Sequence, residues 1–276
     1  MRFTVLGSGS TGNAALISSE KTNILVDAGL SARELLRRLA IVGVDLADLD
    51  GILITHEHTD HVGGLRVLLQ KVKCPVYISG HTEEACYESS WMGKNGENET
   101  AKRRDAMKER TVAIESCKEF RVGDIDIEPF SVPHDAVDNF GFVIKHAGVR
   151  MATLTDFGHF TDLMREKLQC CDAIVIESNH NVDMLRLCPE YSWSLKQRIM
   201  GKRGHFSNED LADWLSNCFD GSARHIVLAH LSQRANNPAL ARMTAETALK
   251  MRPPLFQAET AISLTNHREP TGWFQF

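Results

Sequence analysis

The sequence predicts an α/β fold, with two β-sheets and helices on their outer faces. Strand-like apolar runs are mixed with amphipathic helical segments along all 276 residues, without an internal repeat or a linker. Hydrophobic residues make up 43% of the chain and charged residues 24%, an ordinary composition for a globular protein that buries a sizeable core. We therefore expect one domain that spans residues 1–276.

The order of the elements follows from the apolar periodicity. The expected strands are RFTVLG (2–7), AALIS (14–18), TNILVDAG (22–29), GILIT (51–55), PVYIS (75–79), TVAIES (111–116), CKEFRVGDIDIEPFSV (117–132), FGFVIKHAG (140–148), VRMATLT (149–155), DAIVIES (172–178), HIVLAHLS (225–232) and TAISL (260–264). The expected helices are 30–43, one that follows the two glycines of VGGLRVLLQKV (62–72), one from about 81, 160–169, 208–219 and 238–251. The polar stretch around 92–110 is predicted to be a loop or a solvated helical excursion.

Charge and cysteine content limit the classes of function. The formal net charge is −5, so any binding of nucleic acid must depend on a local basic patch. The seven cysteines are scattered and form no CxxC pair, which is typical of a reduced, cytosolic protein. No signal peptide or membrane-spanning run is visible. We expect a cytoplasmic protein with no membrane partner.

The stretch THEHTDHVGG (55–64) concentrates three histidines and an aspartate directly after the apolar run GILIT. We expect His56, His58, Asp60 and His61 to lie in a tight loop at the end of a buried strand. Packing gives no reason for this cluster, because charged imidazoles would repel and buried ones would lose their solvation. A divalent cation removes both costs, since neutral imidazole and ionised carboxylate are its ligands.

Three more candidate ligands also stand where an apolar run ends. These are His134 in SVPHDA, Asp156 in TLTDFG and His230 in IVLAHLS. Strand ends that meet at one edge of a sheet commonly form a site. Seven ligands are too many for one tetrahedral ion, but they suit two ions about 3.5–4 Å apart that share a carboxylate.

The pattern His56-Glu-His58-Thr-Asp60-His61 resembles the HxHxDH signature of the metallo-β-lactamase superfamily, and the motifs around the other three ligands occur in that family's order. The resemblance covers nearly the whole chain and implies the αββα sandwich of that family. It also implies that one metal ion is bound by His56, His58 and His134. The second would be bound by Asp60, His61 and His230, with Asp156 bridging the two.

Further motifs resemble one branch of this superfamily. The stretches VLGSGSTGNA, TDFG, ESNHN, GHFSNEDLA and LAHLSQRANNP together are similar to the YycJ-like (WalJ) group, which is associated with DNA exonuclease activity. The last two also resemble late motifs of RNase Z, which implies a proton-transfer role for His205. His180 in ESNHN is either a substrate contact or an ordinary loop residue. The separation of Asp156 and His230 leaves no room for a β-CASP insertion, and no Gly/Pro-rich arm is present.

Substrate contacts are less sharply indicated. GSGSTGN (7–13) lacks the GK[ST] ending of a nucleotide triphosphate loop and is either a plain turn or a phosphate contact through backbone N–H groups, Ser10 and Thr11. His205 can also be read as a residue that only precedes a helix N-cap at Ser207. Basic candidates for a nucleic-acid backbone are Arg37 and Arg38, residues 102–104, and Lys202 with Arg203.

We therefore expect a phosphodiester hydrolase that uses two divalent ions and the hydroxide that bridges them. Zinc is the expected metal, while imidazole and carboxylate would also accept manganese or iron. The expected substrate is the end of single-stranded DNA, which would make the protein an exonuclease. The alternative is a small-molecule hydrolase of the same superfamily that acts on a thioester, a lactone or a cyclic phosphodiester. A binding module that uses metals only as a scaffold is a third, weaker reading.

Overall fold

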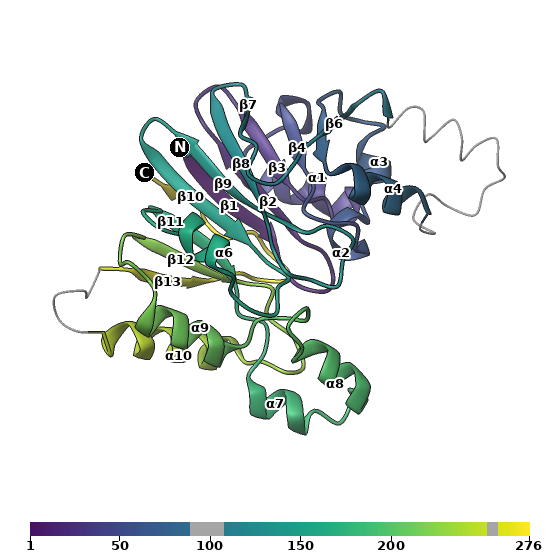
Figure 1. Ribbon diagram of the computed structural model, residues 1–276. Coiled ribbons are helices and arrows are strands. Elements are labelled where there is room, and N and C mark those ends of the chain that lie inside the picture. The colour runs from purple at the N-terminus through teal and green to yellow at the C-terminus, as the bar shows by residue number, and fades with distance from the viewer. Residues whose placement is uncertain (89–107, 253–258) are drawn as a thin grey trace. The chain divides into compact units, whose positions relative to one another are not determined.

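The computed structural model describes residues 1–88, 108–252 and 259–276 (Figure 1). The chain forms two compact units. The first unit contains Met1–Pro129, Ala136–Phe140 and Asn266–Phe276, and the second contains Phe130–Asp135 and Gly141–Thr265. Whether these two units form the predicted single domain over 1–276 depends on how they associate, so the single domain stays a prediction. Most of the polar excursion predicted around 92–110 lies outside the described residues.

Two mixed seven-stranded sheets confirm the predicted α/β class. The first sheet has the order β14 (Phe274–Gln275), β1 (Arg2–Gly7), β2 (Ala14–Ser18), β3 (Asn23–Val26), β4 (Gly51–Leu53), β5 (Val76–Ile78), β6 (Thr111–Ala113). Its pairs are antiparallel from β14 to β3 and parallel from β3 to β6. The carboxyl ends of β3, β4 and β5 therefore share one edge of this sheet.

The second sheet also combines parallel and antiparallel strands. Its order is β13 (Ala261–Leu264), β12 (His225–Ala229), β11 (Ala173–Glu177), β10 (Val149–Leu154), β9 (Phe140–His146), β8 (Ile125–Ser131), β7 (Phe120–Val122). Strands β10 to β13 run parallel, and β9 runs antiparallel to β10. The chain segments that leave β10, β11 and β12 consequently emerge at the same edge.

The helices are short and mostly capped by side chains. They are α1 (Ala32–Ile41), η1 (Leu46–Asp48), α2 (Thr59–Val62), α3 (Leu65–Leu68), α4 (Gly80–Glu88), α6 (Asp162–Lys167), α7 (Val182–Leu187), α8 (Trp193–Ile199), α9 (Asn208–Asn217) and α10 (Pro238–Lys250). Ser31 caps α1 by accepting from Glu34 N, and Ser207 caps α9 by accepting from Asp210 N. Within the described ranges, no helix combines the length and the apolar character that a bilayer span requires.

The helix predicted after the two glycines of VGGLRVLLQKV (62–72) begins at Leu65 but ends at Leu68, and a separate helical turn precedes the glycines. Residues Thr59–Val62 form α2, and Leu65–Leu68 form α3. Gly64 N donates to Ala28 O (2.8 Å), and a Cβ atom at position 64 would lie 2.0 Å from Leu30 O. Only glycine allows this close backbone approach, so the chain turns there instead of continuing one helix.

Each unit has its own apolar core. In the first unit, Leu35 and Leu39 of α1 pack with Leu25 and Ile52 of the sheet. In the second unit, α9 and α10 lie side by side along β12 and β13 (Figure 1). The second core includes a set of stacked aromatic rings, from Phe157, Phe160, Phe206 and Trp214. Packing in these cores holds the strands rigidly, and the polar residues described below follow the ends of these strands.

The buried guanidinium of Arg38 is predicted to be a large contributor to the stability of the first unit. It donates to Leu6 O (2.7 Å), to His267 O (2.9 Å) and to Glu34 (2.7 Å). Arg38→Met would remove a donor from the buried carbonyl of Leu6 and from the partly buried carbonyl of His267, at about 1–3 kcal/mol for each buried group left unsatisfied. We expect urea denaturation to show a free energy of unfolding about 2–4 kcal/mol lower.

The matched control is Arg37→Met, because Arg37 is the exposed neighbour on the same helix and also pairs with Glu34. An exposed ion pair contributes less than about 1 kcal/mol, so this variant should unfold close to the wild type. Equal denaturation midpoints for the two variants would contradict the structural role of Arg38.

Candidate metal centre

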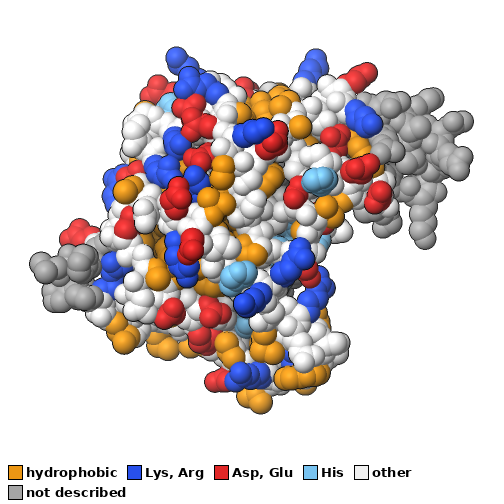
Figure 2. Space-filling view, in the orientation of Figure 1, with side chains coloured by type: hydrophobic (Ala, Val, Ile, Leu, Met, Phe, Trp, Pro, Cys, Tyr) orange, Lys and Arg blue, Asp and Glu red, His pale blue; other side chains and the backbone are white. Residues whose placement is uncertain are grey.

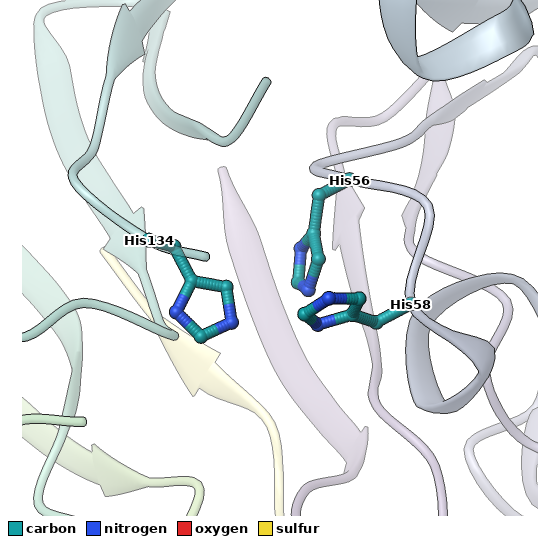
Figure 3. A group of neighbouring side chains, drawn as sticks. All are labelled: His56, His58 and His134. Carbon is teal, nitrogen blue, oxygen red and sulfur yellow. The ribbon is translucent and has the colours of Figure 1, made fainter. Parts of the chain in front are cut away.

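The HxHxDH motif follows β4 and continues into a helical turn. His56 lies on the buried chain after β4, and His58 is the N-cap residue of α2 (Figure 3). Asp60 and His61 lie within α2, so only His56 and His58 of these four residues precede the helix as the predicted loop requires. A helical turn brings Asp60 and His61 back beside the preceding histidines, which an extended chain could not do.

The three imidazoles of this turn are in close contact. The ring centroids of His56 and His58 are 4.6 Å apart, and those of His56 and His61 are 4.0 Å apart. His61 Nε2 is 3.9 Å from Asp60 Oδ2. His56 and His61 are completely buried. Three charged rings could not be held this closely without water, so the arrangement suits neutral imidazoles that act as ligands.

Asp27 supports this turn, although sequence reasoning did not assign it a role. It directly follows β3, and its carboxylate accepts from Thr55 N (2.9 Å), from Thr55 Oγ1 (3.0 Å) and from His61 Nδ1 (2.7 Å). Thr55 Oγ1 also lies 2.9 Å from His56 Nδ1. A carboxylate after the apolar run NILV was the available signal, because it repeats the strand-end pattern of the other candidates.

Replacing Asp27 with asparagine should weaken metal binding without removing a ligand. The change removes the negative charge that holds His61 Nδ1–H, and such outer partners typically contribute 10- to 100-fold to metal affinity or activity. Competition titration of metal-depleted protein with a zinc chelator would measure this loss. Asp50→Asn is the control, since Asp50 is exposed and its carboxylate likewise accepts from a backbone N–H, that of Asn23 (2.8 Å). Equal zinc affinity in both variants would contradict the role of Asp27.

The second unit places its candidate ligands at the ends of alternate strands of its sheet. His134 follows β8, Asp156 follows β10 and His230 follows β12. Asp156 Oδ1 lies 3.2 Å from His230 Nδ1, and both residues are buried. Asp156 (φ 62°) and His230 (φ 54°), like Asp27 (φ 60°), have left-handed backbone. Such conformations are costly for residues other than glycine and often occur at functional sites.

Glu177, the last residue of β11, organises this cluster and was also missed by sequence reasoning. Its Oε1 accepts from His205 Nδ1 and His230 Nδ1, both at 2.8 Å. Its Oε2 accepts from Phe157 N (3.0 Å) and Phe206 N (3.2 Å). Burial by itself would raise the pKa of Glu177, but the charge of His205 and the two imidazole hydrogen bonds lower it well below its ordinary value. Glu177 is therefore an ionised acceptor.

The imidazole of His205 also lies beside the carboxylates of Asp156 and Glu177. Asp156, Glu177, His205 and His230 place one ligand atom each within 4.8 Å of one another. Burial would lower the pKa of His205, whereas the negative charges of Glu177 and Asp156 and the Glu177 hydrogen bond raise it overall. The imidazole consequently retains a proton at neutral pH more readily than a free histidine does. A group that holds a proton beside carboxylates is suited to deliver it.

His134 stands at the edge of the same cluster. Its ring centroid is 5.3 Å from that of His205, and its Nδ1 donates to Gly204 O (3.1 Å). Burial lowers the pKa of His134, and the charge of His205 lowers it further, against the opposing effect of Asp156. In a neutral imidazole with Nδ1 protonated, Nε2 is the atom whose lone pair can bind a metal. The Nε2 atom of His134 lies 3.2 Å from Asp135 Oδ1.

The hydrogen bonds of three candidate ligands fit metal binding. His61 and His230 direct Nδ1 to a carboxylate, and His134 directs Nδ1 to a carbonyl. This outer support is characteristic of metal-ligating histidine, since it fixes the ring and assigns Nε2 to the metal. In His61, Nε2 also lies 3.0 Å from Asn13 Nδ2, so a metal would take the place of this contact. The donor set of imidazole and carboxylate groups therefore suits a divalent ion such as zinc, while the assignment of each ligand stays a prediction.

His180 lies on the chain between β11 and α7, buried against the α9 region. Its backbone pairs with Ser207, and its carbonyl accepts from Asn208 N (2.8 Å). Burial lowers the pKa of His180 to about 4. Its buried Nδ1 has no hydrogen-bond partner among the described residues. A neutral imidazole cannot be a proton donor of the His205 kind, so any contribution from His180 would be a substrate contact, which stays a prediction.

The glycine-rich loop that carries Ser10 and Thr11 is attached to the HxHxDH turn within the first unit. Asn13 N donates to Asp60 O (2.7 Å), and Asn13 Nδ2 lies 3.0 Å from His61 Nε2. Ser10 and Thr11 are exposed, and Gly9 and Gly12 take positive φ values that allow the turn. The loop therefore presents two hydroxyls on a backbone fixed to the candidate ligands. Their contact with a phosphate stays a prediction.

The candidate basic contacts differ in accessibility. Arg38 is buried in the hydrogen bonds given above, and Arg37 pairs with Glu34 and Glu269. Arg38 is therefore not available to a DNA backbone, so the expectation for it is wrong, whereas a contact by the exposed Arg37 stays a prediction. Residues 102–104 lie outside the described residues. Lys202 and Arg203 are exposed and immediately precede the turn that carries His205.

The order and chemistry of these motifs agree with a comparison against known families. The family described as "Beta-lactamase superfamily domain" matches residues 22–231. The chain belongs to the metallo-β-lactamase superfamily. Exodeoxyribonuclease YycJ of Bacillus anthracis is 36% identical over 250 residues, which are 91% of this chain and 89% of that protein. Exodeoxyribonuclease WalJ of Streptococcus pneumoniae is 37% identical over 243 residues, 88% of this chain and 86% of that protein.

Solved structures of the superfamily share the fold. The Zn²⁺-bound PqqB of Methylobacterium extorquens has a TM-score of 0.69 at 15% identity, with 98% of this chain and 99% of that chain covered. The metallo-β-lactamase fold protein YhfI of Bacillus subtilis has a TM-score of 0.67 at 15% identity, with 98% of each chain covered. The protein is a metal-dependent hydrolase of this superfamily with buried histidine and carboxylate clusters.

Proposed function

We propose that this protein is an exonuclease that hydrolyses phosphodiester bonds at the ends of single-stranded DNA, using two divalent metal ions per chain. The observation that carries this proposal is the similarity, over about nine tenths of the chain, to two proteins named exodeoxyribonucleases. The complete HxHxDH motif and the carboxylate–histidine cluster of the second unit supply the chemistry that such a reaction needs.

The proposed metal ligands are those of the superfamily pattern. His56, His58 and His134 would hold one ion, Asp60, His61 and His230 the other, and Asp156 would contact both. Zinc is the proposed metal. When bound, two such ions supply a water that ionises at neutral pH and neutralise the charge that develops on the phosphoryl oxygens. The protein residues fix the ligand tautomers and exclude water from the imidazoles.

We assign the proton transfer to His205. Glu177 fixes its Nδ1–H at 2.8 Å and favours the protonated ring, so Nε2 can present a proton to the leaving oxygen. The same carboxylate holds His230 through Oε1. Glu177 therefore positions a proposed proton donor and a proposed ligand at once. Ser10 and Thr11 are proposed to contact the phosphate of the substrate.

The test compares linear and circular single-stranded DNA of one sequence, labelled at either end, in the presence of zinc or manganese. We expect nucleotides to be released stepwise from linear strands while circles remain intact. A salt series should show a shallow dependence of affinity, with a log–log slope shallower than about −4, because each phosphate contact on a single strand contributes about −0.7.

Other outcomes of this assay would change the proposal in specific ways. Rapid cutting of the circle would identify an endonuclease. Release of nucleotides from RNA and not from DNA would change the proposed substrate to RNA. Inertness towards every nucleic acid, together with turnover of a thioester, a lactone or a cyclic phosphodiester, would move the protein to the small-molecule hydrolases.

A further inference from the structure

The second unit contains a two-helix segment, α7 and α8, between Glu177 and His205. Residues 182–203 contain five basic and two acidic residues, although the chain as a whole has a net charge of −5. The surface over α7 and α8 shows apolar and basic side chains close together, at the lower right of Figure 2. Lys196 is buried, and Arg186 and Arg198 pair with acidic side chains, so Lys202 and Arg203 carry most of the exposed positive charge that this part of a net-negative protein can offer a polyanion.

Two large apolar side chains of this segment face solvent. Leu187 is 81% exposed and Trp193 is 61% exposed. Trp193 is the only aromatic residue among the exposed large apolar side chains of the described ranges. An exposed indole on a basic surface is the feature on which unpaired nucleic-acid bases stack, because every base has a π face whatever its sequence.

The segment is fixed firmly at its start. Asn181 caps α7 by accepting from Met184 N (2.9 Å), and its own N–H donates to Ala235 O (3.0 Å). The buried Lys196 of α8 donates from Nζ to Arg186 O (2.7 Å), which ties α8 to α7. Trp193 therefore stands on a rigid support, and stacking on it would cost little ordering of the backbone.

The end of α8 is attached to the proposed catalytic residues. Arg198 pairs with Asp135, and Arg203 Nε donates to His134 O (2.8 Å). His205 N donates to Ile199 O (2.9 Å). The seven residues from Trp193 to Ile199 span about 9 Å of helix, which is the length of two to three bases stacked at about 3.4 Å.

We propose that Trp193 is a stacking platform for an unpaired base of the DNA strand, two to three nucleotides from the bond that is cleaved. The exposed Lys202 would neutralise a phosphate between that base and His205. This inference rests on the proposed nuclease function, and it would explain why the enzyme selects single-stranded DNA over duplex DNA. A base that is paired and stacked in a duplex presents no free face to the indole.

The test uses Trp193→Ala in the metal-loaded protein, with Met243→Ala as the control because Met243 is similarly exposed (59%) on α10. The substrates are a dinucleotide, a twelve-residue single strand and bis(p-nitrophenyl) phosphate. We expect KM for the twelve-residue strand to rise about tenfold in Trp193→Ala, with kcat unchanged, because one base stack is lost. The dinucleotide and the chromogenic diester should be hydrolysed as by the wild type. Trp193→Phe should recover most of the affinity.

Three results would overturn this inference. Equal KM values of the wild type and Trp193→Ala on the twelve-residue strand would remove Trp193 from the substrate path. A parallel loss on bis(p-nitrophenyl) phosphate would show a structural role. A change of sedimentation coefficient in Trp193→Ala would make this surface a contact between two copies of the chain. If the wild type hydrolyses the chromogenic diester but no DNA, the proposed function itself fails, which is a different outcome from any of these.

Discussion

Asp156→Ala is expected to lose bound metal and hydrolytic activity together. Its buried carboxylate is the group that we propose to contact both ions, and Asp156 Oδ1 lies 3.2 Å from His230 Nδ1. Loss of a bridging ligand should exceed the roughly 100-fold effect of removing an outer partner. Elemental analysis of the purified variant and its rate on single-stranded DNA would measure both losses. Retained activity would remove Asp156 from the site.

Two further variants separate this effect from a loss of the fold. Asp156 has φ 62°, which alanine tolerates poorly, whereas asparagine adopts this conformation readily. Asp156→Asn should therefore keep its denaturation midpoint and still lose metal and activity. Asp162→Ala, which changes an exposed aspartate paired with Arg165 in the same unit, should change neither. Metal loss in Asp162→Ala would show that the assay reports general instability.

His205→Ala is expected to keep its metal ions and its fold but to lose catalysis by about two to four orders of magnitude, the usual contribution of general acid–base help. The physical reason is the proton that Glu177 and Asp156 favour on this imidazole. The measurement is kcat on single-stranded DNA, with elemental analysis of the same sample. His159→Ala is the matched control, because His159 lies nearby and donates only to Lys202 O (2.8 Å).

The position of His205 between Glu177 and the proposed ligands means that metal content and kcat together test its role as proton donor. Its Nδ1 shares the Glu177 Oε1 acceptor with the proposed ligand His230. If His205→Ala lost metal in proportion to activity, His205 would be a ligand and not the proton donor. Unchanged kcat with full metal content would exclude it from both roles.

The fold was predictable where the hydrophobic pattern has a clear period. GILIT, DAIVIES and HIVLAHLS became the buried strands β4, β11 and β12, and NEDLADWLSNCF became α9 with Ser207 as its cap. The elements α7, α8 and β14 were not predicted, since they are short and their polar and apolar residues follow no sustained period. The helix predicted after Gly64 is present as the short α3, whereas the helical turn α2 before Gly63 was expected to be a loop. A backbone contact at Gly64, which no local pattern reveals, separates the two.

The site likewise contains residues that a sequence pattern predicts and residues that only tertiary contacts reveal. Candidate ligands could be predicted because histidine and aspartate are unusual directly after apolar strands. Asp27 and Glu177 follow or end strands too, yet a single carboxylate has no distinctive spacing, so their contacts with His61, His205 and His230 were visible only in three dimensions. The burial of Arg38 is equally a tertiary fact, which is why it was wrongly considered for DNA binding.

We propose above that the chain uses two divalent metal ions to hydrolyse single-stranded DNA from its ends. The most direct measurement is the metal content of protein purified without chelator, taken together with the exonuclease rate of the same preparation as metal is removed and restored. We predict close to two ions per chain and a rate that falls and recovers with the second ion. A stable content at or below one ion per chain, with full activity on linear DNA, would contradict this account.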